Sequence, residues 1–266
     1  YPALIACVLL SVLALGALFT SLPLRDYLAD TQTWAYLRNA LAVLRMQWEL
    51  PGVFSDNVRP QINGSLWTLT IEVRCYALLA IAGLFGLLRQ RVVANAAVLA
   101  LLLFGLFFYE AVPLVGIAEK WSGPTLYFLI GVFLYINRNY VPLERGLFLF
   151  AVVVGGASFG TEWFDAVFPF VFVYLLFYLA YTTPFLNVDG RVGDISYGIY
   201  IYAWPVQQMV CAWFPGIRPL GNTVLASIIV VALAWFSWHY LERPALSLKS
   251  RLTRGRQRPG ELVAAG

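Results

Sequence analysis

Four polar side chains recur along one apolar stretch of this chain and could do chemistry there. Within residues 63–76, NGSLWTLTIEVRCY, spacings of three, four and four separate Ser65, Thr68, Glu72 and Tyr76. On an α-helix this spacing places side chains on one side. Because a carboxylate costs about 3 kcal/mol or more at the centre of a bilayer, Glu72 should face a protein-lined or water-filled cavity. We predict a catalytic or site-organising role for Glu72, with a structural polar contact as the alternative.

The residues around Glu72 have both functional and structural interpretations. Ser65 precedes the apolar run and could cap the helix N-terminus. Trp67 falls at the predicted outer interface, where aromatic belt residues are expected. Arg74 points to another face, and an interhelical ion pair is favoured for it. The substrate-binding candidates of this segment are Ser65, Trp67, Thr68 and Tyr76.

A second polar stripe occupies residues 193–211, GDISYGIYIYAWPVQQMVC. Spacings of four, four, three and four separate Ser196, Tyr200, Trp204, Gln207 and Cys211. Pro205 cannot donate to the carbonyl of Ile201, so the helix should bend and leave an acceptor free. The stripe either lines a polar passage or holds neighbouring helices together. Its substrate-binding candidates are Ser196, Tyr200 and Gln207.

The last motif is residues 239–244, HYLERP. A lone histidine at a membrane boundary is more often an interfacial anchor than a base, so catalysis by His239 is disfavoured. Glu242 and Arg243 are interpreted as a charge pair at a helix end. Pro244 is expected to stop the helix.

Composition sets the fold class that must position these motifs. The 266 residues are 61% apolar and 12% charged, against about 45–50% and about 25% in soluble domains. This predicts an all-α, polytopic membrane helix bundle. About eight apolar windows lie near residues 3–22, 66–88, 92–109, 123–137, 146–161, 165–183, 195–214 and 222–241. The fourth and fifth are short for a bilayer of about 30 Å. The three cysteines show no CxxC spacing, so neither a disulfide framework nor a metal site is predicted.

Basic residues suggest the orientation. After residue 242 the chain carries Arg243, Lys249, Arg251, Arg254, Arg256 and Arg258. Such a cluster after a hydrophobic helix marks the cytoplasmic, anionic-lipid side more often than a nucleic-acid site. We therefore expect a membrane domain over residues 1–242 and a flexible, cytoplasmic basic tail over 243–266. The long connection, residues 23–64, then lies outside, and its centre, residues 33–48, is predicted to lie amphipathically at the interface.

Together the three motifs resemble the acyltransferase-3 superfamily of integral membrane O-acyltransferases, in the branch that acetylates O-antigen and nodulation factors. Its SLW-[ST]-L-x-x-E block is matched by residues 65–72. Its I-S-Y-[SG]-x-Y helix with a following Pro-Val is matched by residues 195–206, and its [YF]-x-E-[RK]-P block by residues 240–244. The motifs occur in the family's order, and the resemblance covers essentially the whole chain.

The resemblance also implies what this sequence lacks. The family core usually has ten helices, and its first helix bears the histidine taken to be the catalytic base. This sequence begins at a Tyr-Pro pair that follows the second helix, so we expect two helices and the base to be missing. Ala203 stands where many members have another histidine. The chain alone is therefore expected to be inactive.

The activity implied is transfer of an acyl group, commonly acetyl, from acyl-CoA to a hydroxyl of an envelope glycan or lipid-linked saccharide. The setting is the bacterial inner (plasma) membrane, with membrane lipid and no nucleic acid as partner. Glu72 would orient the missing histidine or bind the sugar, and Trp67 would offer a stacking face. Arg89 and Arg91 either attract the CoA phosphates or are positive-inside anchors, and no residue is assigned to donor binding.

Two other functions remain open from the residues alone. A carrier or flippase for a lipid-linked glycan would use the same polar stripes as a passage and would need no acyl donor. A non-catalytic membrane scaffold would use them only for packing. The sequence does not determine the acyl group, the acceptor sugar or the oligomeric state.

Overall fold

The computed structural model describes residues 1–41, 46–108, 123–183 and 193–254, with side chains described outside 105–108 and 249–254. Helices form every regular element in these ranges, apart from one isolated bridge between Thr20 and Val53. The predicted all-α class is therefore confirmed. The chain divides into unit 1, Tyr1–Trp67 with Asp189–Gly266, and unit 2, Thr68–Val188.

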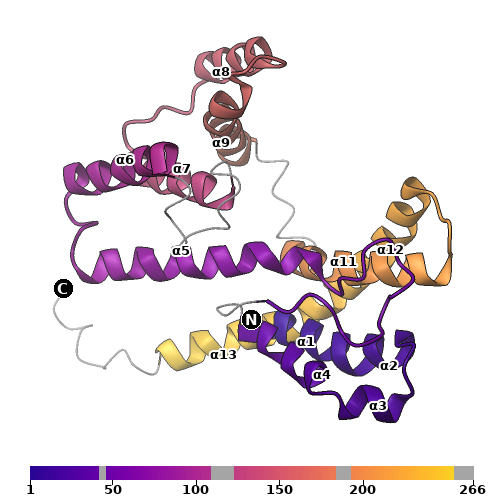
Figure 1. The fold of residues 1–266 in the computed structure, drawn as a ribbon. Coiled ribbons are helices and arrows are strands. Elements are labelled where there is room, and N and C mark those ends of the chain that lie inside the picture. Colours follow the sequence, from indigo (N-terminus) through magenta and orange to yellow (C-terminus); the bar gives the residue numbers. More distant parts are fainter. Residues whose placement is uncertain (42–45, 109–122, 184–192, 255–266) are drawn as a thin grey trace. The chain divides into compact units, whose positions relative to one another are not determined.

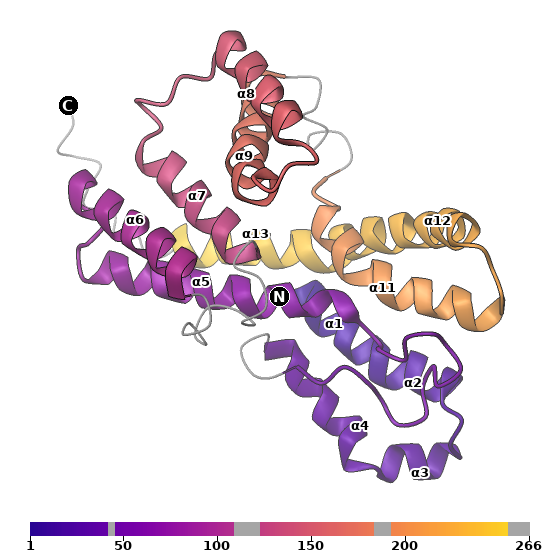
Figure 2. The same ribbon diagram turned by 45° about the horizontal axis from the view of Figure 1, so that its top comes forward.

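Unit 1 contains the first and the last helix that the structure describes (Figures 1 and 2). Its elements are α1 (Pro2–Leu10), η1 (Ser11–Leu15), α2 (Gly16–Phe19), α3 (Leu24–Ala29), α4 (Thr31–Ala35), η2 (Tyr36–Leu41), η3 (Gly64–Leu66), α11 (Ser196–Trp213), α12 (Pro219–Ser237), η6 (Trp238–Glu242) and α13 (Arg243–Arg254). Those of unit 2 are α5 (Trp67–Leu84), whose first residue belongs to unit 1, α6 (Arg91–Phe108), α7 (Pro124–Ile136), α8 (Arg145–Ser158) and α9 (Phe164–Thr182).

Each predicted apolar window contains a helix in the described part of the chain. Among the residues that the structure describes, four helical stretches are long and apolar enough to cross a bilayer: Pro2–Phe19, Gly64–Leu84, Phe164–Thr182 and Pro219–Leu248. Helices α7 and α8 have 13 and 14 residues, so the fourth and fifth windows are short, as predicted. Length and composition thus support a membrane protein.

The closest helix pair of unit 1 is α11 and α12, which lie side by side (Figure 1). Their contact is lined by Val206, Val210, Ala226 and Val230. At Gly198 a Cβ atom would lie 2.9 Å from the Cα and Cβ of Ala234. The two backbones therefore approach closely because neither residue carries a larger side chain.

The long connection folds back onto the first helix. Tyr27 is fully buried and donates a hydrogen bond from its hydroxyl to the carbonyl of Val12, at 2.8 Å. A Cβ at Gly16 would lie 1.8 Å from this hydroxyl, so glycine leaves room for the phenol. Burial raises the pKa of Tyr27 to about 12, which keeps the phenol a hydrogen-bond donor at neutral pH.

The predicted interfacial segment has an unexpected buried side. Thr33, Tyr36 and Asn39 are buried, whereas Trp34 and Leu41 are 46% and 56% exposed. Hydroxyl, phenol and amide groups thus face the protein, and large apolar side chains lie at its surface. Leu44 and Arg45, which were part of the prediction, lie outside the described residues. An interfacial position for the segment stays a prediction.

At one end of unit 2, polar side chains join α6 to α7. Asn137 and Asn95 exchange amide hydrogen bonds of 2.8 and 3.1 Å. Arg91 donates from Nε to Asn137 Oδ1 at 3.0 Å, and its guanidinium carbon lies 3.5 Å from the ring centroid of Tyr140. The start of α6 therefore meets the end of α7 and the loop that follows it. The predicted alternation of spans also requires these two helix ends to share one side of the membrane.

One helix end differs from the prediction. The chain continues as a helix from α12 through the π-helix η6 into α13, so Pro244 does not stop it. Pro244 is the second residue of α13 and follows the π-helical turn η6, so its missing N–H donor falls where the helix changes from π- to α-helical hydrogen bonding. Residues 243–254 of the expected tail are thus helical, and residues 255–266 lie outside the described residues.

The α11–α12 contact makes a first prediction. Replacing Gly198 with Ala should lower the free energy of unfolding by about 1–3 kcal/mol, because the new methyl group overpacks the contact with Ala234. The measurement is thermal or denaturant unfolding of the protein in detergent micelles. Gly131→Ala is the matched control, since its Cβ meets nothing within 4 Å. Equal stability of the Gly198→Ala and wild-type proteins would contradict the close contact.

Candidate functional site

The carbonyl that Pro205 leaves free is bound by side chains from two distant segments. Asn63 donates from Nδ2 to the Ile201 oxygen at 2.8 Å, and the Cys7 thiol lies 3.5 Å from the same oxygen. Asn63 is only 2% exposed. The carbonyl of Ile201 is therefore available to side chains, as predicted. Its contacts join α11 to α1 and to the segment before α5.

Asn63 also holds the start of the first motif. Its Oδ1 accepts a hydrogen bond from the backbone N–H of Ser65 at 3.1 Å and caps η3. The prediction of Ser65 as the N-cap was wrong, because a short 3₁₀ turn precedes α5 and shifts the cap to Asn63. Sequence reasoning missed this residue, although asparagine before Gly-Ser is a common cap signal.

Helix α11 binds the backbone of the long connection through two further side chains. Trp204 donates from Nε1 to the carbonyl of Gln61 at 3.0 Å. Gln208, 7% exposed, donates to the carbonyls of Gln61, at 2.7 Å, and Arg59. Its Oε1 accepts from Asn57 Nδ2 at 2.9 Å. The stripe spacing selected Gln207, so the sequence analysis missed the structural role of its neighbour.

The predicted residues of the second stripe do different things. Tyr200 donates its hydroxyl proton to the carbonyl of Ser65, which links two of the predicted binding residues. Ser196 donates to the carboxylate of Asp194 at the start of α11. Gln207 lines a cavity near the other end of the helix. Unit 1 therefore brings Tyr200 and Ser65 together and leaves Ser196 and Gln207 at separate places.

In unit 2 the carboxylate of the first motif has a neighbour on its own helix. Tyr76 donates its hydroxyl proton to Glu72 Oε1 at 2.7 Å, as expected for residues four apart. The side chains of Glu72 and Tyr76 are exposed, and that of Thr68 is half-buried. The buried side of α5 is formed by Leu69, Thr70, Ile71 and Cys75. Trp67, at the start of α5, is 38% exposed. The roles of Glu72, Tyr76, Thr68 and Trp67 stay predictions.

The third motif contains a buried carboxylate. Glu242 is 8% exposed and accepts a hydrogen bond from the Ser237 hydroxyl at 3.0 Å. Tyr202 in turn donates to the Ser237 oxygen at 3.2 Å. The interpretation of Glu242 and Arg243 as a charge pair at a helix end was wrong, because the π-helical turn carries Glu242 into the bundle. His239 stacks on Trp235, with ring centroids 4.2 Å apart, consistent with an anchor.

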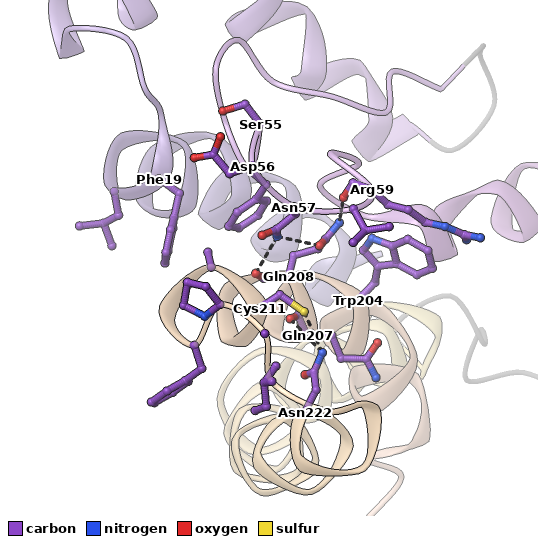
Figure 3. A pocket seen from close by; sticks show the side chains of 18 of the residues that line it. Phe19, Ser55, Asp56, Asn57, Arg59, Trp204, Gln207, Gln208, Cys211 and Asn222 are labelled. Atoms are coloured by element: carbon purple, nitrogen blue, oxygen red, sulfur yellow. Dashed lines mark hydrogen bonds between the residues drawn. The ribbon is translucent and has the colours of Figure 1, made fainter.

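A cavity of about 780 Å³ lies within unit 1, near the end of α11 (Figure 3). Its wall comes from the end of α2, residues 54–59, the last turns of α11 and the start of α12. Asn222 of α12 donates from Nδ2 to the sulfur of Cys211 at 3.0 Å. Of the substrate-binding candidates from the sequence, Gln207 lines this cavity. The sequence analysis did not predict the cavity, because residues 54–59 reach it only through the fold.

Comparison with known proteins gives two relatives. The chain is 26% identical to the O-acetyl transferase of Shigella phage Sf6, over 94% of this chain and 75% of that protein. It is 28% identical to Nodulation protein 10 of Rhizobium leguminosarum bv. viciae, over 73% of this chain and 58% of that protein. No family model and no solved structure matches the chain. The two relatives confirm the resemblance to acyltransferases of the O-antigen and nodulation branch.

The bond at Ile201 makes a second prediction. Asn63→Ala should destabilise the protein by about 1–3 kcal/mol, because a buried acceptor loses its donor. In a Pro205→Ala background the new N–H can bind the Ile201 carbonyl, so Asn63→Ala should cost less there, with a coupling of about 0.5–3 kcal/mol. Unfolding of the four proteins in detergent measures both values.

Asn39→Ala is the control for that cycle. Asn39 bonds to Gln47 and not to Ile201, so its cost should be the same in both backgrounds. If Asn63→Ala cost equally much in the wild-type and the Pro205→Ala background, the freed carbonyl would not be what Asn63 stabilises.

Proposed function

We propose that this chain belongs to a membrane O-acetyltransferase that moves an acetyl group from acetyl-CoA to a hydroxyl of an envelope glycan or lipid-linked saccharide. The observation that carries the proposal is similarity to an O-acetyl transferase along 94% of the chain. The helical membrane fold and the three motifs agree with it. The activity requires a membrane-embedded protein with access to a cytoplasmic thioester and an envelope acceptor.

The proposed location is the bacterial inner membrane, with the C-terminus in the cytoplasm. The basic residues that follow Glu242 support this orientation by the positive-inside rule. Arg91, at the start of α6, is hydrogen-bonded to Asn137 at the end of α7, and Arg138 follows Asn137 in the chain. We propose that these helix ends lie on the cytoplasmic side, where a cationic surface would attract the phosphates of acyl-CoA.

In the proposed reaction, the acetyl group moves from the sulfur of CoA to the acceptor oxygen, and the proton of the hydroxyl must be removed. A general base removes the proton of the acceptor hydroxyl, and the oxygen attacks the carbonyl carbon of the thioester. The C–O bond forms, the C–S bond breaks, and the CoA thiolate leaves and is protonated. Donors must also stabilise the oxyanion that forms during attack.

We assign Glu72 to this site as a positioning or acceptor-binding carboxylate. Its hydrogen bond from Tyr76 fixes one carboxylate oxygen. A carboxylate held in this way can orient an imidazole base and stabilise the imidazolium that forms, or accept a hydrogen bond from the sugar. Ser65, Trp67, Thr68, Tyr76, Ser196, Tyr200 and Gln207 stay individual predictions as substrate contacts.

The proposal makes a third prediction, about Glu72 and its partner. Glu72→Gln should lower acetyl transfer at least about 100-fold, because the amide cannot stabilise an adjacent cation. Tyr76→Phe should cost less, about tenfold, because it removes one hydrogen bond to the carboxylate. The measurement is transfer of labelled acetyl groups from acetyl-CoA into envelope glycan, by membranes of cells expressing the complete gene, at equal protein levels.

Glu162→Gln, at an exposed carboxylate between α8 and α9, is the control and should retain full activity. Unchanged transfer by Glu72→Gln would remove this carboxylate from the site. Movement of unmodified glycan across the membrane, with no dependence on an acyl donor, would replace the enzyme by a carrier.

A further inference from the structure

The cavity of unit 1 is chemically unlike the apolar surfaces of the surrounding helices. Among its lining residues are the carboxylate of Asp56, the amide of Gln207 and the guanidinium of Arg59 (Figure 3). The aromatic rings of Phe19 and Trp204 line it as well. A volume of about 780 Å³ falls within the range of about 300–1,000 Å³ that holds small-molecule ligands.

The wall of the cavity is held in place by contacts already described. Gln208 and Trp204 fix the backbone of residues 59–61 on α11. Phe19 packs against Phe54 and Trp213, with ring centroids 5.0 and 5.6 Å apart. Gln207 and Gln208 both line the cavity, but the Gln208 amide is already bonded to the carbonyls of Arg59 and Gln61 and to Asn57.

One polar atom beside the cavity lacks a partner. Asn222 Oδ1 is buried, and within the described part of the chain no donor bonds to it. Buried amide oxygens are nearly always hydrogen-bonded. Its own Nδ2 is used by Cys211 Sγ. The oxygen has almost no exposed surface in this conformation, so the residue lines the cavity with its other atoms.

The charges of the wall select among ligands. Asp56 and Arg59 supply one negative and one positive charge, and the other polar groups are neutral amides and hydroxyls. A polyphosphate such as the one in CoA would require several cations. Amides, hydroxyls and a carboxylate suit a ligand with many hydroxyl groups, and aromatic rings suit the C–H faces of sugar rings.

The position of the cavity also favours a glycan as its ligand. It lies at the start of α12, and the basic residues follow the other end of that helix. A helix of 19 residues separates the two ends by about 28 Å. If the basic end faces the cytoplasm, the cavity lies on the envelope side, where glycans and not acyl-CoA are found.

We propose that this cavity binds the oligosaccharide part of the acceptor, with Asp56 and Gln207 as its hydrogen-bonding groups and Phe19 and Trp204 as its packing surfaces. The identity of the ligand rests on the proposed function. The cavity would hold sugar units and thereby determine which glycan is acylated.

The experiment uses the purified protein, expressed from its complete gene, in detergent. The probe is oligosaccharide released from the envelope of the source organism, freed of ester groups by mild base and labelled with a fluorophore. Binding is measured without acyl donor. Asp56→Ala and Gln207→Ala should each weaken binding about tenfold and raise the acceptor KM by a similar factor. The donor KM should not change.

Two substitutions outside the cavity are the controls. Glu49→Ala removes an exposed acidic side chain of the same long connection, and Gln90→Ala removes an exposed glutamine of unit 2. Both should bind the oligosaccharide like the wild-type protein. Unfolding curves of all variants in detergent show whether a loss of binding reflects a loss of the fold.

The outcomes separate this inference from the proposed function. Acetyl transfer with wild-type acceptor KM in both cavity variants would overturn the inference and leave the enzyme intact. Binding that depends on Asp56 and Gln207, without any acetyl transfer, would support the sugar site and overturn the enzyme. No binding by the folded wild-type protein would overturn the sugar site.

Discussion

The structure of unit 1 depends on a single backbone carbonyl. Pro205 withdraws the N–H that would bind the Ile201 oxygen, and in an apolar environment an unsatisfied carbonyl is costly. Asn63 supplies the replacement donor at 2.8 Å, and Cys7 approaches from α1. Asn63 also caps η3, which contains the first two residues of the SLW motif. Its amide side chain and the hydrogen bond from Tyr200 to the Ser65 carbonyl therefore join two motifs that lie more than 130 residues apart in the sequence.

The need of buried polar groups for hydrogen-bond partners also explains other contacts in unit 1. Trp204 and Gln208 donate hydrogen bonds to carbonyls of the irregular segment 59–61, which is not helical and so has no carbonyls bonded within a helix. Glu242 is buried where Ser237 can donate to it. These groups make the bundle specific, because each buried donor or acceptor has one geometry in which it is satisfied. Asn222 Oδ1 is an exception among the described residues, because it is buried without a hydrogen-bond partner.

The sequence predicted much of the fold because membrane helices have a strong local signal. Long apolar runs gave the helices, and the missing donor of Pro205 gave a free acceptor at Ile201. The candidate site was harder to predict from the sequence. Helical spacing placed Tyr76 beside Glu72, and this contact is present. Spacing could not show that Asn63 and not Ser65 is the cap, or that Gln208 and not Gln207 holds the long connection. It also could not show that the helix continues through Pro244 after a π-helical turn.

By itself, the sequence determined the all-α membrane class, the helices and the motifs that link this chain to O-acyltransferases, because composition, periodicity and motif spacing are local properties. The tertiary structure decided which donor binds the freed carbonyl and that Glu242 is buried. It also brought residues 54–59 to the end of α11, where they enclose a cavity with the start of α12. These outcomes join segments far apart in the sequence, so only the packing of the helices could determine them.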